Sequence, residues 1–134
     1  MMASDLKPVA DSELVCRRIP PNLPWFEPPD KVTSANFRLD TRVNEQGLSV
    51  YRSAIVSDGQ ILSKPDAIPG SFVVKAAVGS IRGLKNGKDE PLGLDVIRVG
   101  DVDDPGHAEI RGPEPGKLSS AVGKALQRLF KRDL

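Results

Sequence analysis

Glycine and proline interrupt this chain along its whole length, and their distribution constrains the fold more than any other feature. There are 12 of each among the 134 residues. Proline removes a backbone donor, and glycine weakens both helices and strands, so the segments between them are short. The sequence therefore predicts many turns and short strands, with one longer helix near the C-terminus.

Four segments have the apolar pattern of strands: 13–20, 47–56, 94–99 and 107–112. The segment 47–56 alternates most clearly, with Leu48 and Val50 on one face and Ser49 and Tyr51 on the other. Residues 71–84 fit both a helical stripe and a strand, and their β-branched start favours a strand followed by a turn. We expect a short strand or irregular extended segment at 32–40 and a loop at 57–70.

The C-terminal segment KLSSAVGKALQRLFKRD (117–133) predicts an amphipathic helix. Ser119 or Ser120 can cap its start. Its apolar face consists of Leu118, Val122, Ala125, Leu126 and Leu129. The predicted fold class is α+β: a β-rich single domain over 13–134, with a mostly antiparallel sheet of short strands and this helix. Residues 1–12 are polar and predict a flexible N-terminal arm.

Charge and cysteine content narrow the class of protein. The chain has 19 basic and 18 acidic residues and a net charge of +1, which disfavours nucleic-acid or membrane binding driven by bulk charge. The lone cysteine, Cys16, cannot form an internal disulfide, and the N-terminus has no apolar signal segment, so we expect a cytoplasmic protein. His107 and Cys16 could supply at most half of a zinc site, so we predict no metal. The sequence also has no phosphate-binding loop and no Rossmann fingerprint, and we predict no cofactor.

His107 is the single histidine and the first candidate for catalysis. It follows the turn sequence DDPG, at the start of a strand that places Glu109 on the same face. The imidazole can be structural, bonding a carbonyl or a carboxylate, or it can carry a proton near neutral pH. The sequence leaves both interpretations open.

Arginine and serine residues supply the remaining catalytic candidates. Arg17 and Arg18 point to opposite faces of their predicted strand, so one of them needs a carboxylate or phosphate partner. A structural salt bridge is the interpretation we favour. Ser34 and Ser49 lack the strand–turn–helix setting of a nucleophile elbow.

Two segments are candidates for binding a partner. PPNLPWFEPPDK (20–31) holds five prolines around Trp25 and Phe26, which either cap the core or dock another protein. The second candidate is the polar face of the C-terminal helix, which is either solvated or binds acidic groups. Its cations are Lys124, Arg128, Lys131 and Arg132.

Five short pieces occur in the order RRIPP (17–21), TSANF (33–37), LSVY (48–51), LGLDVI (92–97) and DPGHAEIRG (104–112). Together they resemble a group of short, uncharacterised bacterial proteins. This resemblance implies a bacterial origin but no activity. The recurring pieces contain Arg18, Ser34, Phe37, Ser49 and His107.

The order of Arg18, Ser34 and Glu109 is also similar to small ADP-ribosyltransferase-type domains. That similarity implies that an arginine or histidine holds NAD and a glutamate orients the acceptor. Our leading hypothesis is nevertheless a non-enzymatic module that binds another protein through Trp25 and Phe26 or through the terminal helix. The alternative is a small enzyme or nucleotide-binding domain using Arg18, Ser34, His107 and Glu109. The sequence predicts no oligomeric state.

Overall fold

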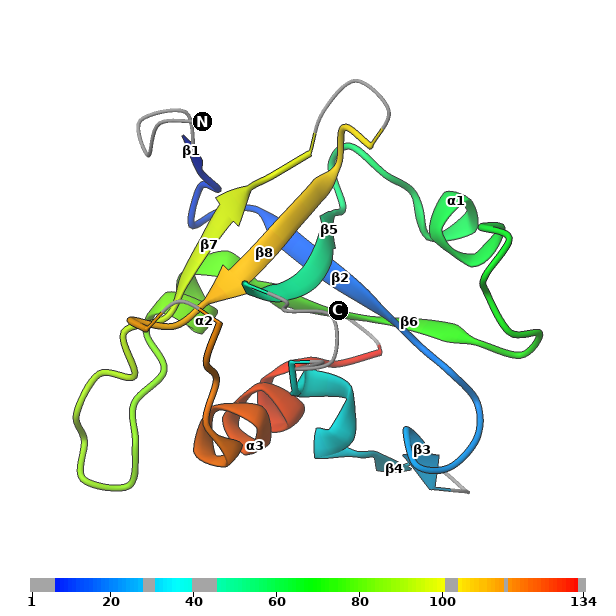
Figure 1. Cartoon of the computed structure of the whole chain (residues 1–134). Helices are drawn as coiled ribbons and strands as arrows, with labels where there is room; N and C mark the ends of the chain where they lie inside the picture. The colour runs from blue at the N-terminus through cyan, green and yellow to red at the C-terminus, as the bar shows by residue number, and fades with distance from the viewer. Residues whose placement is uncertain (1–6, 28–30, 40–45, 101–103, 115, 133–134) are drawn as a thin grey trace.

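A six-stranded antiparallel sheet forms the centre of the computed structural model, which describes residues 7–27, 31–39, 46–100, 104–114 and 116–132 (Figure 1). The strand order is β1-β7-β8-β5-β2-β6, and every pairing is antiparallel. The predicted α+β class is therefore confirmed. The strands are β1 (Lys7–Pro8), β2 (Leu14–Ile19), β5 (Leu48–Arg52), β6 (Phe72–Ala77), β7 (Asp95–Arg98) and β8 (His107–Arg111).

Helical segments and a small hairpin surround this sheet. Helix α3 and the 3-10 helix η2 lie on one side of it, and α1 lies near β6 at another side (Figure 1). The two-stranded hairpin β3–β4 lies on the same side of the molecule as η2, close to one end of β6. These elements are β3 (Phe26–Glu27), β4 (Lys31–Val32), η2 (Ser34–Phe37), α1 (Asp58–Leu62), α2 (Val78–Arg82) and α3 (Ser120–Leu129). No helix in the described ranges is long and apolar enough to cross a bilayer.

The main core lies between the sheet and the layer formed by α3 and η2. Alternation along β2 directs Val15 and Ile19 into this core, while Cys16 faces the opposite side. Phe37 from η2 is fully buried and packs on Phe130, with ring centroids 5.2 Å apart. The predicted apolar face of the C-terminal helix is confirmed where α3 enters the core through Val122 and Leu126, with Leu118 and Leu129 partly buried.

A smaller apolar cluster lies on the other face of the sheet. It contains Cys16, Ile61 and Val73, with Tyr51 and Val56 packed against them. Helix α1 contributes Ile61, its single buried residue. This cluster covers only part of the face, and the strands β5 and β8 present polar side chains beside it.

Several local predictions differ from the structure. We predicted an arm over 1–12, but β1 pairs with β7 and Val9 is buried, so the sheet begins within that segment; residues 1–6 lie outside the described ranges. The predicted loop at 57–70 contains α1, which begins with a capping box in which Ser57 and Gln60 satisfy each other's backbone donors. The ambiguous segment 71–84 is a strand, β6, that continues directly into the helix α2.

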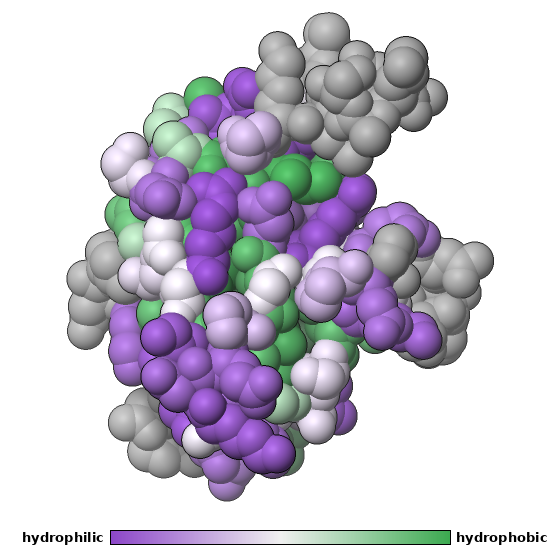
Figure 2. Space-filling view, turned by 90° about the vertical axis from the view of Figure 1, so that its left-hand side faces the viewer, coloured by the Kyte–Doolittle hydropathy of each residue, from purple (hydrophilic) through white to green (hydrophobic). Residues whose placement is uncertain are grey.

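The segment 32–40, predicted as one short strand or extended segment, contributes to two elements in the structure. Lys31–Val32 forms β4, and Ser34–Phe37 forms η2. The predicted strand 47–56 is shorter in the structure: β5 ends at Arg52, where the chain turns, and Ile55 is 46% exposed. Figure 2 shows one face of the molecule. Hydrophilic side chains predominate at its lower end, and hydrophobic side chains are visible between polar ones near its middle.

Candidate functional site

A groove that is open to solvent lies between the β3–β4 hairpin, the edge strand β6 and the C-terminal end of α3. Its volume is about 820 Å³. Its apolar lining includes three aromatic rings, Phe26, Phe72 and Phe130. Five cations, Lys31, Lys124, Arg128, Lys131 and Arg132, also line it, and we call it the basic groove.

Tertiary contacts hold the walls of the basic groove in place. Phe26 of the hairpin packs edge-on against Phe72, with ring centroids 5.3 Å apart. Gln127 of α3 donates a hydrogen bond to the carbonyl of Val32 at 2.8 Å. Lys131 exchanges two backbone hydrogen bonds with Lys75 of β6, at 2.8 and 2.9 Å. The groove is therefore formed by three segments that are distant in the sequence.

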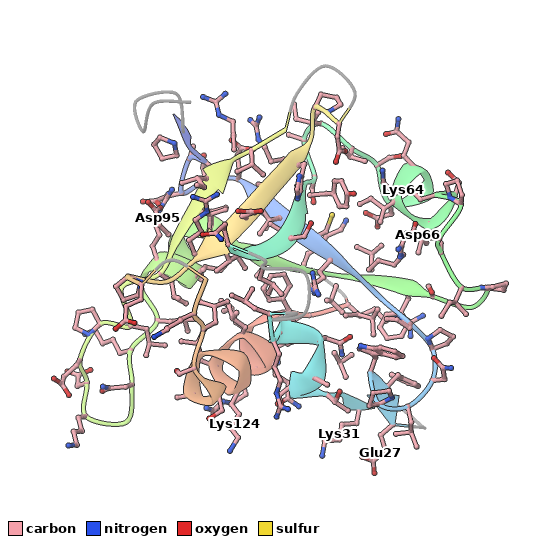
Figure 3. The ribbon with its side chains drawn as sticks, in the orientation of Figure 1. Glu27, Lys31, Lys64, Asp66, Asp95 and Lys124 are labelled. Atoms are coloured by element: carbon pink, nitrogen blue, oxygen red, sulfur yellow. The ribbon has the colours of Figure 1, made fainter. Side chains whose placement is uncertain are left out.

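Five cations line the basic groove, and an acidic residue beside them, Glu27, faces Lys31 across the β3–β4 hairpin. None of its five cations forms an ion pair with another residue in the described part of the chain, and no acidic side chain lines it there. Arg132 lies over the ring of Phe72, with its guanidinium carbon 4.1 Å from the centroid. Figure 3 shows Lys31 and Lys124 at the same side of the molecule, with the exposed Glu27 beside Lys31. Cations without ion pairs around an apolar floor favour an anionic ligand with an apolar part.

The basic groove brings together two segments that sequence analysis nominated separately. Five of the six nominated partner-binding residues line it: Phe26, Lys124, Arg128, Lys131 and Arg132. The sixth, Trp25, precedes β3 and is 36% exposed. Its carbonyl accepts hydrogen bonds from the Asn36 amide side chain at 2.7 Å and from the Thr33 backbone at 3.1 Å, which fix the aromatic pair next to the groove.

Sequence reasoning missed Lys31, Phe72 and Phe130 as groove residues. Lys31 and Phe130 lie within the two segments already considered, although neither was nominated as a binding residue, and no local signal marks Phe72. It looks like an ordinary strand residue, and it reaches the groove because β6 is the edge strand of the sheet.

The four nominated catalytic residues do not form one site. Ser34, in η2, lines the basic groove, whereas Arg18, His107 and Glu109 lie on the opposite face of the sheet. Glu109 accepts hydrogen bonds from Arg111 through Nε at 2.9 Å and Nη2 at 2.8 Å. The NAD-binding arrangement that requires Arg18, Ser34 and Glu109 together is therefore not formed.

The two arginines of β2 point to opposite faces, as the strand period requires. Arg18 pairs with Asp66 at 3.0 Å and donates to the Ile61 carbonyl at 3.3 Å. The hydrogen bond from Arg18, together with its charge, lowers the pKa of the Asp66 carboxyl. Arg17 instead donates to the carbonyls of Asn36 at 2.7 Å and Ser49 at 2.5 Å, so it ties η2 to the sheet.

His107 has a partner that sequence analysis set aside. Its Nε2 shares a hydrogen bond with the Ser49 hydroxyl at 2.7 Å, and its Nδ1 lies 3.8 Å from Asp104 Oδ2.

Cys16 is fully buried, and burial raises the pKa of its thiol, as expected for a structural cysteine. Within the described ranges, no cluster of three or more His, Cys, Asp or Glu side chains could hold a metal ion.

Comparisons with protein families, curated proteins and solved structures found no match to this chain.

Proposed function

We propose that this protein is a binding module that holds an acidic polypeptide segment in the basic groove. The observation that carries the proposal is the set of five groove cations without ion-pair partners among the described residues, arranged around an apolar floor. Elsewhere on the surface, cations such as Arg82 and Lys64 have carboxylate partners. Exposed cations such as Lys88 and Arg98 also form no ion pair within the described residues, so the groove is distinguished by five such cations gathered around one apolar floor.

The shape and chemistry of the groove define the ligand further. Carboxylates of the partner would pair with Lys124 and Arg128 on α3 and with Lys31 on the hairpin. An apolar side chain between them would contact the rings of Phe26 and Phe72. Because the groove is open to solvent at its surface, an extended segment suits it better than an enclosed metabolite.

A polypeptide fits this chain better than a nucleic acid does. The net charge is only +1, so there is no long-range positive field of the kind that nucleic-acid-binding domains use. Trp25 lies next to the groove and is partly exposed, and tryptophan is enriched among the residues that dominate protein–protein binding energy.

The test measures binding of a fluorescent Glu-rich peptide carrying one central leucine, by fluorescence anisotropy at low and high salt. We expect binding that weakens with added salt, and a loss of at least about tenfold in affinity for the double variant Lys124→Glu, Arg128→Glu. The matched control is Lys88→Glu, Arg98→Glu, which makes the same charge change at exposed positions outside the groove.

Three results would contradict this proposal. The first is equal binding of a peptide in which every Glu is replaced by Gln. The second is an equal loss of affinity in the control variant. The third is tighter binding of single-stranded oligonucleotides, which would assign the groove to nucleic acid instead.

A further inference from the structure

A serine and the single histidine are brought into contact on the face of the sheet opposite the basic groove. Strands β5 and β8 are antiparallel neighbours in which Tyr51 pairs with His107 and Ser49 pairs with Glu109. Ser49 and His107 are therefore diagonal neighbours on one face, and the Ser49 Oγ lies 2.7 Å from His107 Nε2. This is the distance and the ring nitrogen that a serine nucleophile needs for its general base.

The other side of the imidazole faces a carboxylate. Asp104 Oδ2 lies 3.8 Å from His107 Nδ1, in the turn that leads into β8. The other carboxylate oxygen, Oδ1, lies 4.0 Å from the ammonium of Lys64. The same turn is tied to the strand by a hydrogen bond from the His107 backbone to the Asp104 carbonyl at 3.2 Å. At 3.8 Å this contact is electrostatic and is not a hydrogen bond, and the carboxylate favours the imidazolium that forms when Nε2 takes the serine proton.

We propose that Ser49 is a nucleophile activated by His107, with Asp104 as a positioning residue. The Ser49 oxygen attacks an ester carbonyl carbon, and its proton passes to His107 Nε2. The carbon–oxygen bond to the leaving alcohol breaks, and the imidazolium returns the proton to that alcohol. Water then attacks the acyl–serine with the imidazole again taking a proton, which releases the carboxylic acid and restores the hydroxyl.

The surroundings indicate the class of substrate. The charged groups on this face are paired with one another, Lys64 with Asp104 and Arg111 with Glu109, so the face does not select an anion as the basic groove does. The ring of Tyr51 lies 5.9 Å from the imidazole, and the ammonium of Lys64 lies over it, 5.0 Å from its centroid. The His107 side chain is 25% exposed, so small molecules can reach it. The substrate class is therefore a small, uncharged acyl ester.

The test combines labelling and turnover. The full-length protein is incubated with a fluorophosphonate probe, and the modified residue is located by peptide mass spectrometry. Hydrolysis of p-nitrophenyl acetate is then followed. We expect the label on Ser49, and a fall in hydrolysis toward background, about a hundredfold, in Ser49→Ala and His107→Gln. Ser120→Ala, an exposed serine on α3, is the matched control and should leave both readouts unchanged.

Asp104 has its own test. Asp104→Asn should slow the labelling of Ser49, and Asp104→Glu should restore part of the rate, because it keeps a carboxylate near Nδ1.

Labelling of the wild-type protein does not depend on whether a variant folds. Absence of label on Ser49 in the folded wild type, or hydrolysis unchanged in Ser49→Ala, would overturn the proposal. Neither result affects the basic groove, which lies on the other side of the sheet.

Discussion

Gly106 allows the turn before β8 to pack directly on the loop after β5, and replacing it with alanine tests this packing. A Cβ added at Gly106 would lie 2.0 Å from Val56 Cγ2 and 3.3 Å from Val56 Cβ. A contact of 2.0 Å is far inside van der Waals distance, so either Val56 or the turn must move. The carbonyl of Gly106 accepts a hydrogen bond from the Arg52 backbone at 2.9 Å, which opposes movement of the turn.

Overpacking of this kind costs about 1–3 kcal/mol, and the reduced freedom of the unfolded chain returns about 0.4–1 kcal/mol. We therefore expect Gly106→Ala to lower the free energy of unfolding by about 1–2 kcal/mol. Val56→Ala alone removes a partly buried side chain from the cluster with Ile61 and should cost about 1 kcal/mol. The double variant should be no less stable than Val56→Ala, because the new methyl group occupies the space that valine leaves.

Urea unfolding followed by circular dichroism gives the free energy of each of the four proteins. The reasoning predicts a coupling energy of about 1–2 kcal/mol in favour of the double variant. Additive losses, with the double variant less stable than either single variant, would show that Val56 is not what makes glycine necessary at position 106.

Three further predictions concern stability and reactivity. Arg52 lowers the pKa of the Glu13 carboxyl through hydrogen bonds of 2.8 and 3.0 Å. The stabilisation from this ion pair is present above the unfolded-state pKa of Glu13 and is lost as the pH falls through its folded-state pKa. In Glu13→Gln, the free energy of unfolding should therefore fall less steeply as the solution is acidified. Ser57→Ala removes the α1 cap and should lower stability by about 1 kcal/mol in urea titrations, whereas Ser63→Ala at the other end should cost less. Cys16 is buried with a raised pKa, so its alkylation by iodoacetamide should become fast only in denaturant; rapid modification of the native protein would contradict its burial.

The strands and the C-terminal helix could be predicted because their signals are local. In 47–56 the alternation of Leu48 and Val50 with Ser49 and Tyr51 is a property of neighbouring residues, and it reappears as the two faces of β5. Ser119 caps α3 by accepting from the Val122 backbone at 3.3 Å, as a serine before an apolar helical stripe predicts. The capping box of Ser57 and Gln60 is also a local signal, because a serine followed three residues later by glutamine marks the start of a helix. The prediction of a loop at 57–70 did not take this signal into account.

The segment 71–84 shows where local information ends. It satisfies both periods because its first half is a strand and its second half a helix, and the change occurs between Ala77 and Val78. Pairing with β2 holds the first half extended, and the Val78 backbone donates to the Glu13 carbonyl at 2.9 Å as the chain turns. Neither contact can be read from the segment itself.

The sequence by itself determined the class of fold and the apolar face of α3, since both follow from the spacing of residues close together in the chain. Only the tertiary structure decided which chemical groups meet. Strand order made Phe72 a groove residue beside Arg132, and the register of β5 against β8 gave His107 the hydroxyl of Ser49 instead of that of Ser34. The physical reason is that strand pairing sums backbone hydrogen bonds and side-chain burial over the whole sheet, so the neighbours of a residue across the sheet depend on contacts far from it in sequence.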